Sequence, residues 1–352
     1  TMRSMIEDFR ILPAGHCGSG AMRNLLYHYC DLDLPEGVVF GLGAGLDTVY
    51  FDYPEANPPF MLFGRGATME ADLAKTLGID YVERVQADNE LAWQEVREEV
   101  LAGRPTMLSG DIFYLDYRNF KVHFPAHRFI LLGFDEARDE CYIADRVNDY
   151  PETCSLSALA RSRNPSSTIS TRNLWGKFSS GIQRNPLPLA CGIALRMTVE
   201  RMQGMDKSQQ EGMTAMTSKP QSVATGLKGM HTFIDNLKAW PDLPDAAEHA
   251  QYVDNAIIKF GTGGGFFRDH FAAFMQWARE QRPDLVSQTT VDLAFQSARE
   301  WNLLSPTMQS LANNPDDKPR WLQALDQAES IFETEYALFN FLGDTVLRDT
   351  AS

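Results

Sequence analysis

The spacing of apolar residues divides the chain into two parts. In the first part, short apolar runs bounded by glycine, proline and polar turns are typical of strands, and a few amphipathic helical segments lie among them. From about residue 189 onward, apolar residues recur at helical spacing. We therefore predict an α+β protein. An N-terminal domain with an antiparallel sheet is expected over residues 1–155, and a mostly α-helical domain over 156–352, opening with a connector at 156–188.

The first part contains clear helix and strand signals. Asp88 or Asn89 is a suitable N-cap for a helix over 88–102, and Gly103 is a suitable stop. The segment VVFGLGAGLDTVYFDY at 38–53 is expected to be a glycine-containing strand or hairpin, because its last residues favour strand. Further strands are predicted at 60–63 and 105–108, and further helices at 17–29 and 70–77.

The second part is predicted to be a series of helices. A polar stretch rich in Met and Gln at 202–219 is typical of a mobile loop. The sequence GTGGGFFR at 261–268 leads into one helix, and such an entry either binds an anion or serves as a flexible turn. The predicted helices cover residues 190–204, 222–238, 246–259, 266–280, 285–301 and 318–341.

Two apolar runs, 127–134 and 141–145, flank the polar turn DEARDE and predict an antiparallel hairpin. His127 and Asp145 are nearly equidistant from the centre of the turn. We therefore expect them to be cross-strand neighbours within about one register step. A histidine beside a carboxylate is the base and its orienting group in a catalytic triad. The alternative is a purely structural His–Asp pair.

Cys17 stands among glycines in the sequence GHCGSG at 15–20, and an amphipathic helix pattern follows at once. A helix N-terminus favours an anion and lowers the pKa of a thiol, while glycines let a substrate approach the sulfur. These features are typical of an acyl-forming nucleophile. The alternative is a small buried cysteine at the start of a core helix.

Charge and cysteine content narrow the class of protein. The chain has 352 residues and a formal net charge of −15, so a duplex nucleic-acid partner is not expected. The five cysteines are widely spaced and odd in number, which argues for a reducing compartment such as the cytoplasm. No apolar run reaches the ~18 residues that span a bilayer, and the first residues lack the design of a secretory signal, so no membrane partner is expected.

Residues 153–199 form a basic island, with six Lys or Arg residues and no Asp or Glu. Arg161, Arg163 and Arg172 are its first three cations, and we predict that they dock an acidic carrier protein or its phosphopantetheine phosphate. The alternative is a solvated connector whose cations pair with acidic neighbours.

The order Cys17, His127, Asp145 resembles the papain-like cysteine enzymes, especially the bacteriocin-processing peptidases. A closer resemblance is to the butirosin-pathway acyltransferase BtrH family. The motifs that carry it are HCGSGAMRNLLYHY at 16–29 and FGLGAG at 40–45, and in the second part GTGGGFFR at 261–268 and EYALF at 335–339. The processing peptidases have a Gln shortly before the Cys, whereas ILPAGH precedes Cys17 here.

The resemblance implies acyl transfer. An acyl group would leave a phosphopantetheine thioester on an acyl carrier protein, load onto Cys17, and pass to a small amine acceptor. His127 would be the general base and acid, and Asp145 would orient its ring. The substrate carries the phosphopantetheine, so neither a cofactor nor a metal is expected. We also expect substrate contacts from His16, Ser19, Gly43, Asp111, Tyr114 and Arg268.

Other functions stay open. The same triad could hydrolyse or cyclise a carrier-bound acyl chain. A metal-binding module could use His16, Cys17, His123 and His127, although Pro125 argues against a helix that would align the last two. A non-enzymatic helical partner protein is a further alternative, and it leaves the glycine-flanked cysteine unexplained.

Overall fold

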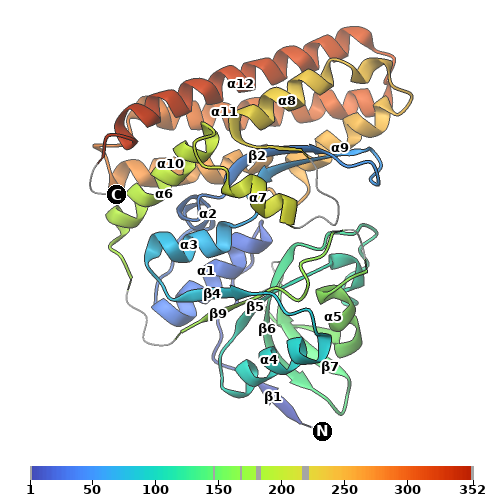
Figure 1. Cartoon of the computed structure of the whole chain (residues 1–352), viewed down its shortest axis with the longest axis vertical. Helices are drawn as coiled ribbons and strands as arrows, with labels where there is room; N and C mark the ends of the chain where they lie inside the picture. Colours follow the sequence, from blue (N-terminus) through green and yellow to red (C-terminus); the bar gives the residue numbers. More distant parts are fainter. Residues whose placement is uncertain (1, 146, 167–168, 180–183, 216–221, 350–352) are drawn as a thin grey trace. The chain divides into compact units, whose positions relative to one another are not determined.

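The computed structural model describes residues 2–145, 147–166, 169–179, 184–215 and 222–349. The chain is α+β and forms two compact units (Figure 1). The sheet unit comprises the described residues of 1–36 and 78–184. The helical unit comprises residues 37–77, 185–215 and 220–352.

The sheet unit is built on an antiparallel sheet with the strand order β4-β9-β5-β6-β7-β8, and β1 pairs with the end of β6. The predicted strands at 105–108, 127–134 and 141–145 are confirmed as β5, β6 and β7. The strands of this sheet are β1 (Arg3–Met5), β4 (Tyr81–Arg84), β5 (Thr106–Gly110), β6 (His127–Asp135), β7 (Glu140–Ala144), β8 (Glu152–Ser155) and β9 (Trp175–Phe178).

Helices cover both faces of this sheet. The helices of the unit are α1 (Cys17–Cys30), α4 (Asn89–Leu101), the 3-10 turn η1 (Ile112–Tyr114) and α5 (Leu156–Arg163). Val96 of α4 and Leu159 of α5 share one core with Phe129 of β6. Ile130, the next residue on β6, instead lies near Cys17 of α1. Since successive strand residues face opposite sides, α1 covers the other face.

The β6–β7 hairpin has a different register from the predicted one. Ile130 pairs with Ala144, so the next step would bring Asp145 opposite Phe129 rather than His127. A bulge between Leu131 and Gly133 shifts the pairing relative to a regular hairpin. His127 and Phe129 face the same side of the strand, so His127 is a diagonal neighbour of Asp145 and still within reach of it.

The helical unit combines a small antiparallel sheet, β10-β2-β3, with helices that pack over it. Tyr50 and Phe60 of the sheet join Phe233, Trp301 and Ile331 of the helices in one buried core. The strands are β2 (Leu46–Asp52), β3 (Phe60–Arg65) and β10 (Val223–Ala224). The helices are α2 (Glu36–Leu42), α3 (Met69–Leu77), α6 (Leu187–Met202), α7 (Ser208–Ala215), α8 (Gly226–Leu237), α9 (Ala246–Ile258), α10 (Arg268–Gln281), α11 (Gln288–Asn313) and α12 (Lys318–Val346), with 3-10 turns η2 (Trp240–Asp242) and η3 (Gly265–Phe267).

Two predictions for individual segments were wrong in part. The segment 38–53 is a helix up to Leu42 and a strand only from Leu46. The stretch 202–219 was predicted to be a loop, but 208–215 is helix α7, and 216–219 lie outside the described residues. Among the residues that the structure describes, no helix has the length and apolar character needed to cross a bilayer.

The two units divide the chain differently from the predicted boundary at 155/156. Strand β9 lies between β4 and β5, so the stretch predicted as a connector contributes both α5 and β9 to the sheet unit. Strands β2 and β3 pair with β10 rather than with the large sheet, so residues 37–77 belong to the helical unit. Each unit is therefore assembled from separate stretches of sequence.

Candidate functional site

Cys17 is the first residue of helix α1, and the side chains around it hold this helix start in place. Nδ1 of His16 accepts a hydrogen bond from the backbone N–H of Ser19 (3.2 Å) and lies 2.8 Å from its hydroxyl. The Glu36 carboxylate accepts from the N–H groups of Gly15 (3.1 Å) and His16 (2.6 Å) and from the Ser19 hydroxyl (3.2 Å). His16 and Ser19, predicted as substrate contacts, are buried and fix the helix N-terminus.

Gly20 allows the segment before Cys17 to lie close against α1. A Cβ atom at Gly20 would collide with the Cβ of Ala14. Met22, Leu25 and Leu26 are fully buried, so the opposite side of the helix is anchored in the core. Cys17 itself is buried, with 8% of its surface exposed. The glycine is therefore needed for close packing around the cysteine.

His127 joins Cys17 to Asp145. Its Nε2 lies 2.9 Å from both carboxylate oxygens of Asp145, which leaves Nδ1 as the nitrogen for the thiol. Burial of the ring lowers the pKa of His127, but the charge and hydrogen bond of Asp145, together with the hydrogen bond and charge of Cys17, raise it to about 9. The three residues predicted as a triad are thus in contact in one buried site.

Asp145 has two further partners that the sequence did not suggest. The hydroxyl of Tyr117 donates a hydrogen bond to Oδ2, and Nη2 of Arg118 lies 3.7 Å from the same oxygen. Burial opposes ionisation of Asp145, but His127, Arg118 and Tyr117 together hold its pKa well below the usual range. Asp145 is therefore a stable anion, and a strong partner for an imidazolium ring.

A small cavity of about 10 Å³ lies beside Cys17 and Asp145. This volume is close to what one water molecule requires. Its walls come from the segment before α1, from α1 itself and from β6 and the end of β7. They consist of Ile11, Leu12, Cys17, Gly20, Ala21, Asn24, Arg128, Ile130, Ala144 and Asp145.

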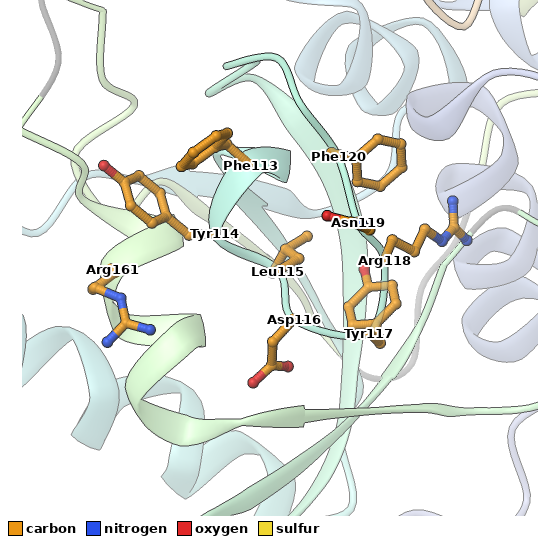
Figure 2. A pocket seen from close by; sticks show the side chains of 9 residues that line it. All are labelled: Phe113, Tyr114, Leu115, Asp116, Tyr117, Arg118, Asn119, Phe120 and Arg161. Carbon is orange, nitrogen blue, oxygen red and sulfur yellow. The ribbon is translucent and has the colours of Figure 1, made fainter.

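A larger pocket of about 500 Å³ lies under the segment 113–120, which contains Tyr117 and Arg118. Figure 2 shows Phe113, Tyr114 and Arg161 on one side of it and Arg118, Asn119 and Phe120 on the other. Tyr114 was predicted as a substrate contact and Arg161 as a docking residue. The pocket brings the two together, next to the residues that contact Asp145.

The sequence matches two protein-family models, and one of them includes the motifs near Cys17. Residues 16–146 match the family model described as Butirosin biosynthesis protein H, N-terminal. Residues 157–342, more than half of the chain, match the model described as Domain of unknown function (DUF4872). The chain belongs to the DUF4872 family. No curated protein matches the sequence.

The match to the model described as Butirosin biosynthesis protein H, N-terminal includes Cys17, His127 and Asp145, so the similarity to that family covers all three residues. It also covers residues 37–77, which fold with the DUF4872 region in the helical unit. The two family regions therefore share a compact unit, although they are separate in sequence.

Asp111 binds His123 in a second His–Asp pair of this BtrH-like region. The Asp111 carboxylate lies 2.8 Å from Nδ1 of His123 and accepts from the N–H groups of Phe113 (3.1 Å) and Phe124 (2.9 Å). The His123 ring stacks on Phe113 with 4.1 Å between the centroids. Asp111 is fully buried, so it organises the loop rather than offering a free carboxylate.

Gly43 and Arg268, the other predicted substrate contacts, belong to the helical unit. A Cβ at Gly43 would lie 2.7 Å from the carbonyl oxygen of Met69, so this glycine permits close packing. Arg268 is 1% exposed, and it donates to Glu335 (2.6 Å), to the carbonyl of Asp47 (2.7 Å) and to the hydroxyl of Thr48 (2.7 Å). The guanidinium group of Arg268 is thus hydrogen-bonded to residues of the helical unit.

The glycine-rich entry to α10 is a turn with internal partners. Gly261, Gly263, Gly264 and Gly265 all have positive φ, which glycine adopts without steric cost. The N–H of Gly264 donates to Thr262 (3.0 Å), and that of Gly265 donates to Asn302 (2.9 Å). These contacts favour the turn over the anion site as the interpretation of this motif.

The basic island divides into buried, paired and exposed cations. Arg163 is 2% exposed and donates to the carbonyl of Ala92 (3.0 Å). Lys177 pairs with Glu99 (3.0 Å), and Arg196 pairs with Glu200 (3.0 Å). Arg161 and Arg172 are exposed. These two are the predicted docking residues that are accessible to a partner.

Proposed function

We propose that the protein is a cysteine-dependent acyltransferase with Cys17 as nucleophile, His127 as general base and acid, and Asp145 as the group that orients the imidazole. The contact of His127 with both Cys17 and Asp145 carries this proposal. The resemblance to papain-like cysteine enzymes belongs to the same proposal. It is supported by a cysteine at a helix start, a histidine at a strand start and a carboxylate on Nε2.

The electrostatics of the site favour a thiolate–imidazolium pair. With its pKa raised to about 9, His127 is protonated at neutral pH and places a positive charge beside the sulfur. In the first turn of α1, the N–H of Ser19 already donates to Nδ1 of His16, and the anionic Glu36 carboxylate binds the N–H groups of Gly15 and His16 just before the helix. The charge of His127, rather than the helix terminus, is therefore the main stabilisation of the thiolate.

The reaction would have two halves. The Cys17 thiolate attacks the thioester carbonyl carbon of the carrier-bound substrate, and the bond to the carrier sulfur breaks as His127 gives that sulfur its proton. An acyl-Cys17 thioester remains. An amine then attacks the acyl carbon, neutral His127 takes a proton from the amine nitrogen, and Cys17 leaves as a thiolate. An amide is released, and the thiolate–imidazolium pair is restored.

An acyl-enzyme is the decisive observation. We expect intact mass spectrometry to detect the acyl group on the full chain after incubation with acyl-carrier or N-acetylcysteamine thioesters, and Cys17→Ala to abolish it. His127→Ala should reduce the rate by several orders of magnitude, and Asp145→Asn by somewhat less. His123→Ala is the matched control because His123 belongs to the other His–Asp pair, and it should stay active. If no acyl-enzyme forms with any thioester, the proposal fails.

The carrier partner is a separate part of the proposal. We infer that Arg161 and Arg172 meet an acidic carrier, so replacing both by Glu should raise KM for a carrier-bound substrate and flatten its salt dependence. A small N-acetylcysteamine thioester should react almost unchanged because it needs no docking surface. Equal losses of activity with both substrates would indicate that the two arginines are structural.

Acylation of Cys17 followed by release of free acid instead of amide would identify a hydrolase with the same triad.

A further inference from the structure

Two neighbouring residues of one loop contact the carboxylate of Asp145. Tyr117 donates its hydroxyl hydrogen to Oδ2, and Arg118 brings a cation to 3.7 Å from the same oxygen. Both residues lie in the segment between η1 and β6. Oδ2 of Asp145 is thus shared by the imidazole and this Tyr–Arg pair.

The two loop residues stabilise Asp145 in different ways. A buried carboxylate is costly unless its oxygens are hydrogen-bonded and its charge is compensated. Tyr117 supplies a directional bond, and the pKa of its hydroxyl lies well above the ordinary value because of burial and the charge of Asp145, so it remains a donor. Arg118 supplies charge, and 3.7 Å is too long for a hydrogen bond. One residue therefore constrains orientation, and the other adjusts the electrostatic potential.

Charged and titratable groups around His127 and Asp145 come from two elements and one loop. Cys17 lies at the start of α1, Arg128 on β6 lines the small cavity beside Asp145, and Tyr117 and Arg118 come from the loop. Tyr117 and Arg118 both contact Oδ2 of Asp145. They are the groups best placed to change how Asp145 acts on the imidazole.

We propose that Tyr117 and Arg118 are positioning residues of the triad: Tyr117 fixes the carboxylate of Asp145, and Arg118 limits how strongly that carboxylate raises the basicity of His127. This inference rests on the proposed catalytic use of His127 and Asp145. It adds that the loop under which the 500 Å³ pocket lies is part of the catalytic machinery.

The signs of the expected effects follow from electrostatics. Removing the Arg118 cation removes a repulsion felt by the imidazolium, so the pKa of His127 should rise by roughly 0.5 to 1 pH unit in Arg118→Gln. Removing the Tyr117 hydroxyl leaves more negative charge on Asp145 for His127, so Tyr117→Phe should raise the pKa of His127 by about half as much. Arg118→Lys keeps the cation and should return most of the Arg118→Gln change.

The test is a titration of His127 by NMR in the full chain, with ¹³C-labelled histidine and the His127 signal assigned from its loss in His127→Gln. Arg161→Gln is the matched control, because Arg161 lines the same pocket on the side opposite Arg118 (Figure 2). In the acyl-transfer assay, Tyr117→Phe should lower kcat about tenfold and leave KM unchanged, as expected for a group that acts on orientation.

An unchanged pKa of His127 in the folded Arg118→Gln and Tyr117→Phe variants would overturn the inference, as would an equal shift in Arg161→Gln. If one variant does not fold, the other decides the question. The titration needs no substrate, so its result is separate from the acyl-enzyme experiment. A shifted pKa without an acyl-enzyme would keep the positioning role and reject acyl transfer.

Discussion

Asp145 carries its negative charge in a place almost closed to water, with 3% of its surface exposed. Its charge and that of His127 stabilise each other, so both contribute to folding in a pH-dependent way. The contribution of His127, whose pKa is raised, is complete below its unfolded pKa of about 6.5 and is lost as pH rises through about 9. The contribution of Asp145, whose pKa is lowered, is lost as pH falls through its folded value. The ion pair is therefore intact near neutrality.

We expect sub-stoichiometric iodoacetamide to label Cys17 first among the five cysteines. Burial raises the pKa of the Cys30 thiol and raises that of Cys191 to about 12. Its hydrogen bond to Cys154, together with burial, raises the pKa of the Cys141 thiol. Labelling of Cys17 should persist at about pH 6, where ordinary thiols are nearly all protonated, and should be lost there in His127→Gln. Peptide mapping by mass spectrometry measures both, and preferential labelling of Cys141 would contradict the prediction.

Helices and strands differ in how well their local sequence predicts them. The helix over 89–101 and the hairpin of β6 and β7 follow from local signals: an Asp88 N-cap in the first case, and two apolar runs around a polar turn in the second. The bulge between Leu131 and Gly133 carries no comparable sequence signal. It moves Asp145 from opposite residue 130 to opposite Phe129, which faces the same side of the strand as His127 and lies two residues from the predicted position. Local sequence thus predicted that His127 and Asp145 are in contact, but not the strand pairing that brings them together.

Helix α2 shows why a local pattern can mislead. Its residues GVVFGL are those of a buried strand by composition. Gly37 and Gly41, however, stand one helical turn apart, and α10 packs closely against both. A Cβ at Gly37 would lie 2.9 Å from the carbonyl of His270, and one at Gly41 would collide with Phe274. The helix is therefore selected by tertiary packing, which the sequence alone could not reveal. Tyr117 and Arg118 were missed for the same reason, since only the folded loop brings them to Asp145.

The start of α1 gives a prediction at the scale of an element. Gly→Ala normally stabilises a helix, but Gly20→Ala should destabilise the protein by about 1–3 kcal/mol because its Cβ would collide with that of Ala14. The double variant Ala14→Gly, Gly20→Ala should recover most of the loss, since the remaining distance to the Cα of residue 14 is an ordinary 3.7 Å. Urea unfolding of the three variants measures this. A stable Gly20→Ala variant would show that the segment before Cys17 adapts freely.

At the scale of the whole molecule, the order of the sequence and the compact units do not coincide. The two family matches divide the chain between residues 146 and 157, close to the boundary predicted from apolar spacing. The units instead exchange segments: residues 37–77 fold with the helical unit, and 78–184 complete the sheet unit. Apolar spacing reports local secondary structure, whereas membership of a unit depends on strand pairing between residues far apart, such as Phe51 with Val223. The sequence therefore predicted the classes of structure but not their partition.

This partition predicts that the chain cannot be cut at 155/156 into two stable domains. A fragment of residues 1–155 would lack β9, whose pairing covers the edges of both β4 and β5, and would expose the apolar residues of β2 and β3 that pack in the helical unit. The fragment 156–352 would lose the strands beneath its helices. We expect each fragment alone to show no cooperative thermal unfolding by circular dichroism, with the full chain as control, and coexpression to restore a soluble complex. The prediction would be wrong if the isolated fragment 1–155 unfolded cooperatively and its Cys17 were still labelled at about pH 6. In that case the triad would need neither β9 nor the helical unit.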